Sequence, residues 1–137
     1  MYGIPFDYIG PEDIGKTADL RSKWDVIVAG PGLNTQAVDG IAMYRNAEPW
    51  KNSSDTPNIG TFAQTDDIRP GMQLEGLIHL RDFVTKGGVY IGATSSADFV
   101  LTNGLIRSIT TARTGTDSRV VGSLLRTKIA DDASPIM

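Results

Sequence analysis

Three adjacent hydroxyl side chains, Thr94, Ser95 and Ser96, are the best placed in this chain for nucleophilic chemistry. They follow Gly92 and Ala93 at the end of an apolar run. Small residues allow the sharp strand-to-helix turn that carries the nucleophile of α/β hydrolases, whose pattern is G-x-S-x-G. The N-terminus of the helix after such a turn helps to stabilise negative charge. Thr94, Ser95 and Ser96 are therefore the candidate catalytic residues.

A hydroxyl nucleophile needs a base that takes its proton. The only histidine is His79, which precedes the turn on a helix expected to end at Gly87 and Gly88. Because this helix runs antiparallel to the strand after it, we expect His79 to lie away from the serines and to be structural. Ser95 or Ser96 would then cap the following helix, a common role of serine. We therefore expect no catalytic residue in this chain.

A glycine-rich turn, Gly30-Pro31-Gly32, follows an apolar run. The third glycine of a dinucleotide-binding pattern is replaced by Thr35, so the simplest interpretation is a tight turn. Its amides could also form half of an oxyanion hole. Open α/β sheets bind ligands at the carboxyl ends of their strands. A small-ligand site would therefore use Gly30, Gly32 and Ser95.

Metal and macromolecular partners are restricted by composition. With no cysteine and one histidine, the chain cannot form a disulfide, a thiolate metal site or a two-histidine zinc site. Asp66-Asp67 is interpreted as a helix-start pair and Asp131-Asp132 as a turn. The net charge is −3 and no basic patch is present, which argues against nucleic acid. No apolar run approaches the roughly 20 residues that span a bilayer. We expect no metal, no cofactor and no membrane partner.

The elements that position these residues follow from hydrophobic patterning. Residues 25–29 form an unbroken apolar run, which predicts a strand buried on both faces, as in a parallel sheet. Residues 6–10 and 89–93 are further predicted strands. Apolar residues at helical spacing predict a helix over residues 74–86, ended by the glycine pair. This order is typical of a three-layer α/β domain with a mostly parallel sheet.

The remaining segments give weaker patterns. Residues 48–64 contain prolines, asparagines, serines and a glycine, which predict a loop. A long loop in a compact domain is usually functional, a partner surface or disordered, so residues 45–65 are assigned no single role. We also predict short helices at 18–21, 37–44 and 97–102, and strands at 106–112 and 120–129.

Several segments match one family in chain order. They are YGIPFDYI (2–9), LRSKWDVI (20–27), TDDIRPGMQLEG (65–76), LRDFV (80–84) with the glycine pair, VGS (121–123) and SPI (134–136). The chain resembles the domain that follows the catalytic domain in a group of large bacterial zinc carboxypeptidase-like proteins. That accessory domain is similar in fold to class I glutamine amidotransferases, with a flavodoxin-like sheet.

The resemblance implies a fold without its chemistry. The amidotransferase cysteine would lie near Thr94 and Ser95, and its histidine–acid pair near the C-terminus, and this chain has neither. The zinc ligands of the carboxypeptidase, two histidines and a glutamate, belong to another domain. The resemblance further implies an exported, extracytoplasmic parent. We expect residues 1–137 to be a single domain, a fragment that lacks the first strand–helix unit.

Three functions follow. The first is a non-catalytic accessory domain with a structural or peptide-binding role, whose partner is the parent's catalytic domain or a second copy of this chain in a homo-oligomer. The second is a stand-alone serine hydrolase that uses Ser95 or Ser96. The third is a small-ligand binding module at the strand ends.

Overall fold

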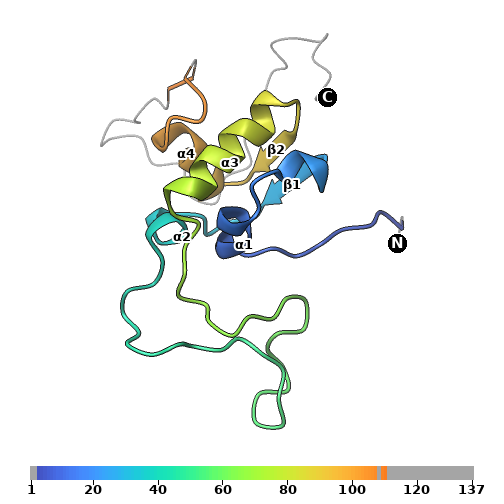
Figure 1. The fold of residues 1–137 in the computed structure, drawn as a ribbon, viewed down its shortest axis with the longest axis vertical. Helices are drawn as coiled ribbons and strands as arrows, with labels where there is room; N and C mark the ends of the chain where they lie inside the picture. Colours follow the sequence, from blue (N-terminus) through green and yellow to red (C-terminus); the bar gives the residue numbers. More distant parts are fainter. Residues whose placement is uncertain (1–2, 108, 111–137) are drawn as a thin grey trace, which may run out of the picture.

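The computed structural model describes residues 3–107, 109 and 110 of the chain. The described residues form short helices and two strands, and α3 is the longest of these helices (Figure 1). None of the described helices is long and apolar enough to cross a membrane. The elements are α1 (Pro11–Lys16), η1 (Leu20–Ser22), β1 (Val26–Ala29), α2 (Thr35–Asp39), α3 (Gln73–Thr85), β2 (Val89–Gly92) and α4 (Ser95–Thr102).

The two strands β1 and β2 form a parallel sheet, in which Val26 pairs with Val89 and Ala29 with Gly92. Parallel strands need a long crossover, and the chain through α2 and α3 supplies it. The predicted strands at 25–29 and 89–93 and their parallel pairing are thus confirmed. The described chain is a mixed α/β structure with a small parallel sheet.

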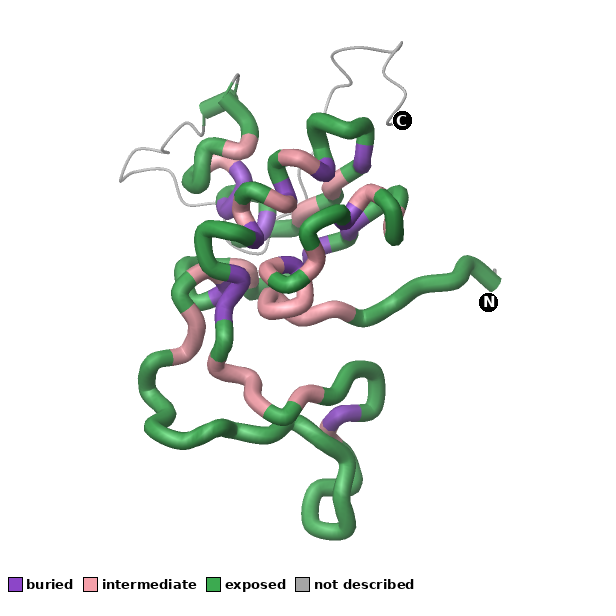
Figure 2. Tube along the Cα trace, in the orientation of Figure 1, coloured by how far each residue is buried: buried purple, intermediate pink, exposed green. Residues whose placement is uncertain are grey.

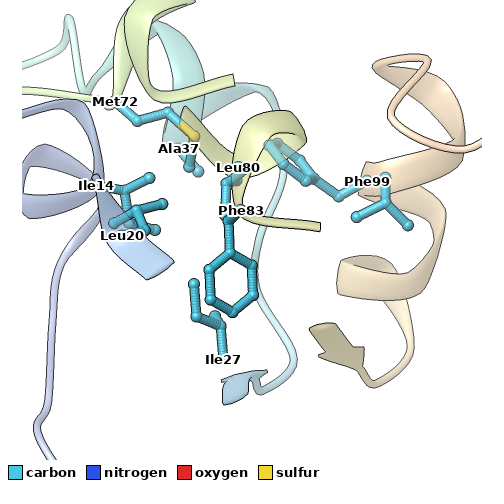
Figure 3. Packing of buried hydrophobic residues seen from close by; sticks show 9 residues of the cluster. Ile14, Leu20, Ile27, Ala37, Met72, Leu80, Phe83 and Phe99 are labelled. Carbon is cyan, nitrogen blue, oxygen red and sulfur yellow. The ribbon is translucent and has the colours of Figure 1, made fainter. Parts of the chain in front are cut away.

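The helix α3 packs on one face of this sheet and forms the core. Figure 3 shows the ring of Phe83 beside Ile27 of β1, with Leu80 and Phe99 near it. Ile14 of α1 and Leu20 of η1 belong to the same core cluster. The predicted helix stop is confirmed, since Gly87 has φ +85°, a conformation that glycine adopts at little cost. This packing holds the two strand ends in a fixed place.

The other face of the sheet carries apolar side chains that stay exposed. Val28 of β1 is 72% exposed, and the burial of β1 alternates along the strand. The prediction of burial on both faces is therefore wrong for the described residues, because α3 covers only one face. The exposed side chains of this face are Val26, Val28, Val89 and Ile91. We call these four residues the open sheet face.

The predicted strand at residues 6–10 is also wrong. These residues have no strand partner, and Phe6 and Tyr8 are exposed. A helix starts immediately afterwards: Pro11 occupies the first turn of α1, and the Asp13 carboxylate accepts a hydrogen bond from the Gly10 N–H at 2.8 Å. Proline at a helix start with a reciprocal acid three residues on is a helix-start signal.

Other short elements differ in extent from prediction. In place of the helix predicted at 37–44, α2 spans Thr35–Asp39 and ends at Gly40, whose φ is +89°. The helix predicted at 18–21 is replaced by the 3₁₀ helix η1, which spans Leu20–Ser22. The helix predicted at 97–102 is confirmed as α4, which starts two residues earlier. No strand forms over the described part of 106–112, and residues 120–129, 131 and 132 lie outside the described residues.

The long loop, residues 41–69, extends from the helices as an irregular excursion and is mostly exposed (Figures 1 and 2). The Ile41 N–H donates to the Arg69 carbonyl at 2.8 Å and closes its base. Trp50 and Thr65 form an antiparallel bridge within it. The predicted loop at 48–64 is confirmed, and its backbone is tied by hydrogen bonds.

Candidate functional site

The parallel register brings two turns together at the carboxyl ends of β1 and β2. Ala29 pairs with Gly92, and the Ala93 N–H donates to the Ala29 carbonyl at 3.1 Å. The turn after β1 therefore lies beside the turn that leads into α4. We call this region the strand-end site. It consists of Gly30, Gly32, Thr94, Ser95 and Ser96.

Both serine hydroxyls of the strand-end site bond to the turn after β1. The Ser95 hydroxyl accepts a hydrogen bond from the Gly32 N–H at 3.0 Å. The Ser96 hydroxyl donates to the Gly30 carbonyl and is completely buried. The residues predicted as a ligand site, Gly30, Gly32 and Ser95, are thus brought together. The Gly32 N–H is therefore already bonded to the Ser95 hydroxyl.

Thr94 occupies the sharp turn between β2 and α4. It has φ 54° and ψ −120°, an unfavourable conformation for a β-branched residue. It is also the N-cap residue of α4, without a side-chain cap hydrogen bond. The prediction that Ser95 or Ser96 caps this helix is therefore wrong, because both serines are already its first helical residues. Their hydroxyls serve the neighbouring turn instead.

His79 is bonded to another part of the fold. Its Nδ1 lies 2.9 Å from the carbonyl oxygen of Ile14, so the ring joins α3 to α1. Because a carbonyl oxygen can only accept, Nδ1 carries the N–H that donates in this contact. This geometry agrees with the expected structural role.

Tyr90 is the titratable residue that touches the strand-end site. Its hydroxyl donates to the Ser96 carbonyl at 3.0 Å. Burial raises the pKa of Tyr90, because the phenolate would lose its hydration. The phenol is therefore protonated at neutral pH and acts as a donor.

The acidic pair Asp66-Asp67 has a different role from the one predicted. The helix that follows begins only at Gln73, so neither residue caps it. Instead, the Asp67 carboxylate accepts hydrogen bonds from Nε and Nη2 of Arg69, at 2.8 and 2.6 Å. These bonds hold the pKa of Asp67 well below its usual range. Asp66 pairs with Lys51.

The Asp67–Arg69 pair fastens the base of the long loop. The Asp67 carboxylate also accepts the Glu48 N–H at 3.2 Å, and the Arg69 Nη1 donates to the Arg45 carbonyl at 3.0 Å. Sequence reasoning missed this clamp, although an acid and an arginine two residues apart were visible. Within the described residues, no group of three or more potential metal ligands gathers.

Neither models of protein families, nor curated proteins, nor solved structures match this chain significantly. The resemblance to the accessory domain of zinc carboxypeptidase-like proteins therefore stays a prediction.

Proposed function

We propose that this chain is a non-catalytic α/β domain whose strand-end site is a structural joint between β1 and β2. The observation that supports this is the pair of hydroxyl contacts across the two turns. Ser95 accepts from the Gly32 amide, and Ser96 donates to the Gly30 carbonyl. Each hydroxyl thereby satisfies a backbone group of the other turn, which fixes the turns relative to each other.

The same contacts make nucleophilic chemistry by the serines unfavourable. A nucleophilic hydroxyl donates its proton to a base. Ser96 donates to a backbone carbonyl, and that acceptor cannot take up a proton at neutral pH. The one imidazole of the chain, His79, contacts the Ile14 carbonyl, and the hydrogen bonds of the two serine hydroxyls go to Gly32 and Gly30 instead of to this ring.

Alanine variants test this proposal. Ser96→Ala should lower the free energy of unfolding by about 1 kcal/mol, the net value of a typical buried hydrogen bond. Ser95→Ala should lower it less, because its hydroxyl is exposed. Chemical denaturation gives both values, with Ser53→Ala as a matched hydroxyl deletion in the long loop. Turnover of p-nitrophenyl acetate that disappears in Ser95→Ala or Ser96→Ala, but persists in Ser53→Ala, would refute the structural role.

The domain would be the amidotransferase-like accessory domain of a zinc carboxypeptidase-like parent, with a three-layer fold and no zinc of its own. A three-layer fold covers both faces of its sheet, so the open sheet face is where the further layer would lie. The parent's catalytic domain or a second copy of this chain would supply that cover.

Self-association tests the partner at the open sheet face. Val28→Lys places a charge on this face, and Met43→Lys is a matched control because Met43 is 77% exposed in the long loop. In sedimentation equilibrium the unmodified chain and Met43→Lys should associate as concentration rises, and Val28→Lys should stay a monomer. Equal behaviour of all three chains would leave the parent's catalytic domain as the proposed cover.

A hydrolase remains the second candidate, and one observation favours it. The backbone of Thr94 holds the strained conformation expected of a nucleophile at a strand-to-helix turn. In this alternative Thr94 would take the role first assigned to Ser95 or Ser96. A Thr94→Ser variant that turns over esters faster than the parent chain would support it, and equal inactivity of both would count against it.

A further inference from the structure

A separate hollow lies between the long loop and the N-terminal residues, outside the strand-end site. Its volume of about 430 Å³ is within the range of small-molecule sites. Its walls come from two segments that are far apart in sequence. Residues 8 and 10–13 form one wall, and residues 50, 58–65 and 68 form the other.

The walls of the hollow are rich in aromatic side chains. The rings of Tyr8 and Phe62 lie 5.0 Å apart between centroids, tilted by 37°. Trp50 lines the same hollow. Phe62 is 74% exposed and Trp50 is 46% exposed, so their faces are available to a ligand. Aromatic faces carry negative charge density and attract cations.

The charged side chains that line the hollow are both acidic. They are Glu12 and Asp13, and neither lysine nor arginine belongs to the lining. The Asp13 carboxylate accepts the Gly10 N–H and is used in the start of α1. Among the described residues, no cation forms a salt bridge with Glu12. Glu12 is therefore the carboxylate available to a bound cation.

In the loop wall of the hollow, close packing and hydrogen bonds restrain the backbone. Gly60 is buried and has φ +68°. A Cβ added there would lie 2.9 Å from the backbone nitrogen of Asn52. The side chain of Asn52 donates to the Pro57 carbonyl at 2.6 Å, which closes the tip of the loop. A site that is formed before the ligand arrives loses less entropy on binding.

We propose that this hollow binds an alkylguanidinium group, the head of an arginine side chain. A planar guanidinium stacks on aromatic faces and pairs with a carboxylate through parallel N–H bonds. Trp50 and Phe62 supply the aromatic faces, and Glu12 supplies the carboxylate. The site lies apart from Ser95 and Ser96, so its occupancy is independent of the function proposed for them.

The test compares two isosteric ligands on the full chain. N-acetyl-arginine methylamide carries the guanidinium, and N-acetyl-citrulline methylamide has the same shape without the charge. Binding is followed by isothermal titration calorimetry and by tryptophan fluorescence in a Trp24→Phe background, where Trp50 is the only indole. The arginine compound should bind roughly two- to fivefold more tightly, the ratio expected for a cation at an exposed aromatic site.

Variants assign the contacts. Trp50→Ala should weaken binding of the arginine compound, and Glu12→Gln should reduce its advantage over the citrulline compound. Asp55→Asn removes a charge from the long loop at a residue that does not line the hollow. It should change neither the affinity for the arginine compound nor the preference over the citrulline compound. Circular dichroism of each variant confirms that it is folded. Free arginine carries a charged α-ammonium and α-carboxylate where the blocked compound has two neutral amides, so weaker binding of free arginine would indicate a peptide as the source of the group.

Three results would overturn the proposal. The first is equal binding of the arginine and citrulline compounds, which would make the hollow a neutral apolar site. The second is an undiminished preference in Glu12→Gln. The third is an absence of saturable binding at millimolar concentrations. Tighter binding of free arginine than of the blocked compound would keep the guanidinium site but assign it to the free amino acid.

Discussion

Between α3 and the face of the sheet that it covers lies a buried apolar core, whereas the long loop exposes its large side chains. Phe83 is 1% exposed in the layer, and Phe62 is 74% exposed in the loop. The layer is held by apolar contacts. The loop is held by polar bonds, such as the Asp67–Arg69 pair and the backbone bridge between Trp50 and Thr65. Figure 2 shows the same contrast in the distribution of burial.

This contrast has a consequence for stability and function. Cooperative unfolding free energy comes mainly from buried apolar surface, so it should depend on the layer. A loop fastened at its base can change its exposed side chains with little effect on that free energy. The exposed aromatic side chains of the loop could therefore contact a ligand without a loss of core packing.

The largest expected effect is the loss of a core ring. Phe83→Ala should lower the free energy of unfolding by about 3–5 kcal/mol, through lost transfer energy and a cavity beside Ile27. The matched loop variant Phe62→Ala should change it by less than about 0.5 kcal/mol, as surface substitutions do. Urea denaturation followed by far-ultraviolet circular dichroism gives both values. Similar losses in the two variants would mean that the loop belongs to the same cooperative unit.

A methyl group added at two glycines probes the same division. A Cβ at Gly88 would lie 2.5 Å from ring atoms of Phe83, so Gly88→Ala should destabilise the layer by roughly 1–3 kcal/mol. Gly60→Ala meets the Asn52 nitrogen in the loop and should leave the main unfolding transition unchanged. Trp50 fluorescence should change in Gly60→Ala alone. A shifted main transition in Gly60→Ala would contradict the separation of loop and layer.

A substitution at the strained turn residue Thr94 should raise the unfolding free energy, whereas Phe83→Ala and Gly88→Ala should lower it. Thr94→Gly relieves the unfavourable φ of 54° but adds freedom to the unfolded chain. The net result should be a gain of about 1 kcal/mol in unfolding free energy. Thermal unfolding measures this gain, with Gly40→Ala as a control that adds strain at φ +89° and should lower stability. An unchanged or lower stability in Thr94→Gly would show that the threonine side chain makes a contribution larger than its backbone strain.

The smallest effect on global stability concerns the clamp at the base of the loop. Arg69 lowers the pKa of Asp67 below the ordinary value of 3.8, so the clamp stabilises the closed loop above that pH. Its contribution is lost as the pH falls from 3.8 through the lower folded pKa. Acid should therefore open the loop, which Trp50 fluorescence in the Trp24→Phe background reports.

Substitutions separate the clamp from general acid unfolding. Asp67→Asn should give the open-loop fluorescence already at pH 7, with the layer still folded by circular dichroism. Asp55→Asn, in the same loop but outside the clamp, should behave as the unmodified chain. If Asp67→Asn keeps the neutral-pH fluorescence of the unmodified chain, then the ion pair does not hold the loop.

Elements with strong local signals could be predicted from the amino-acid sequence. The β-branched run that became β1, the periodic apolar residues of α3 and the glycine pair after it were all predicted with the right type and nearly the right bounds. The hydroxyl cluster at the end of β2 and the glycine turn after β1 were also identified. These signals are local, because each depends on residues within a single helix, turn or strand.

The way in which these elements contact one another could be seen only in the folded structure. Residues 6–10 have strand-like composition, but no partner strand lies beside them and a helix start follows at once. The hydroxyls of Ser95 and Ser96 were expected to cap their own helix, and the parallel register placed an amide and a carbonyl of another turn within their reach. Likewise Tyr8 and Phe62 come from segments 54 positions apart in number and stack only in the fold. Such contacts depend on the spatial arrangement of distant segments, and no local pattern in the chain encodes them.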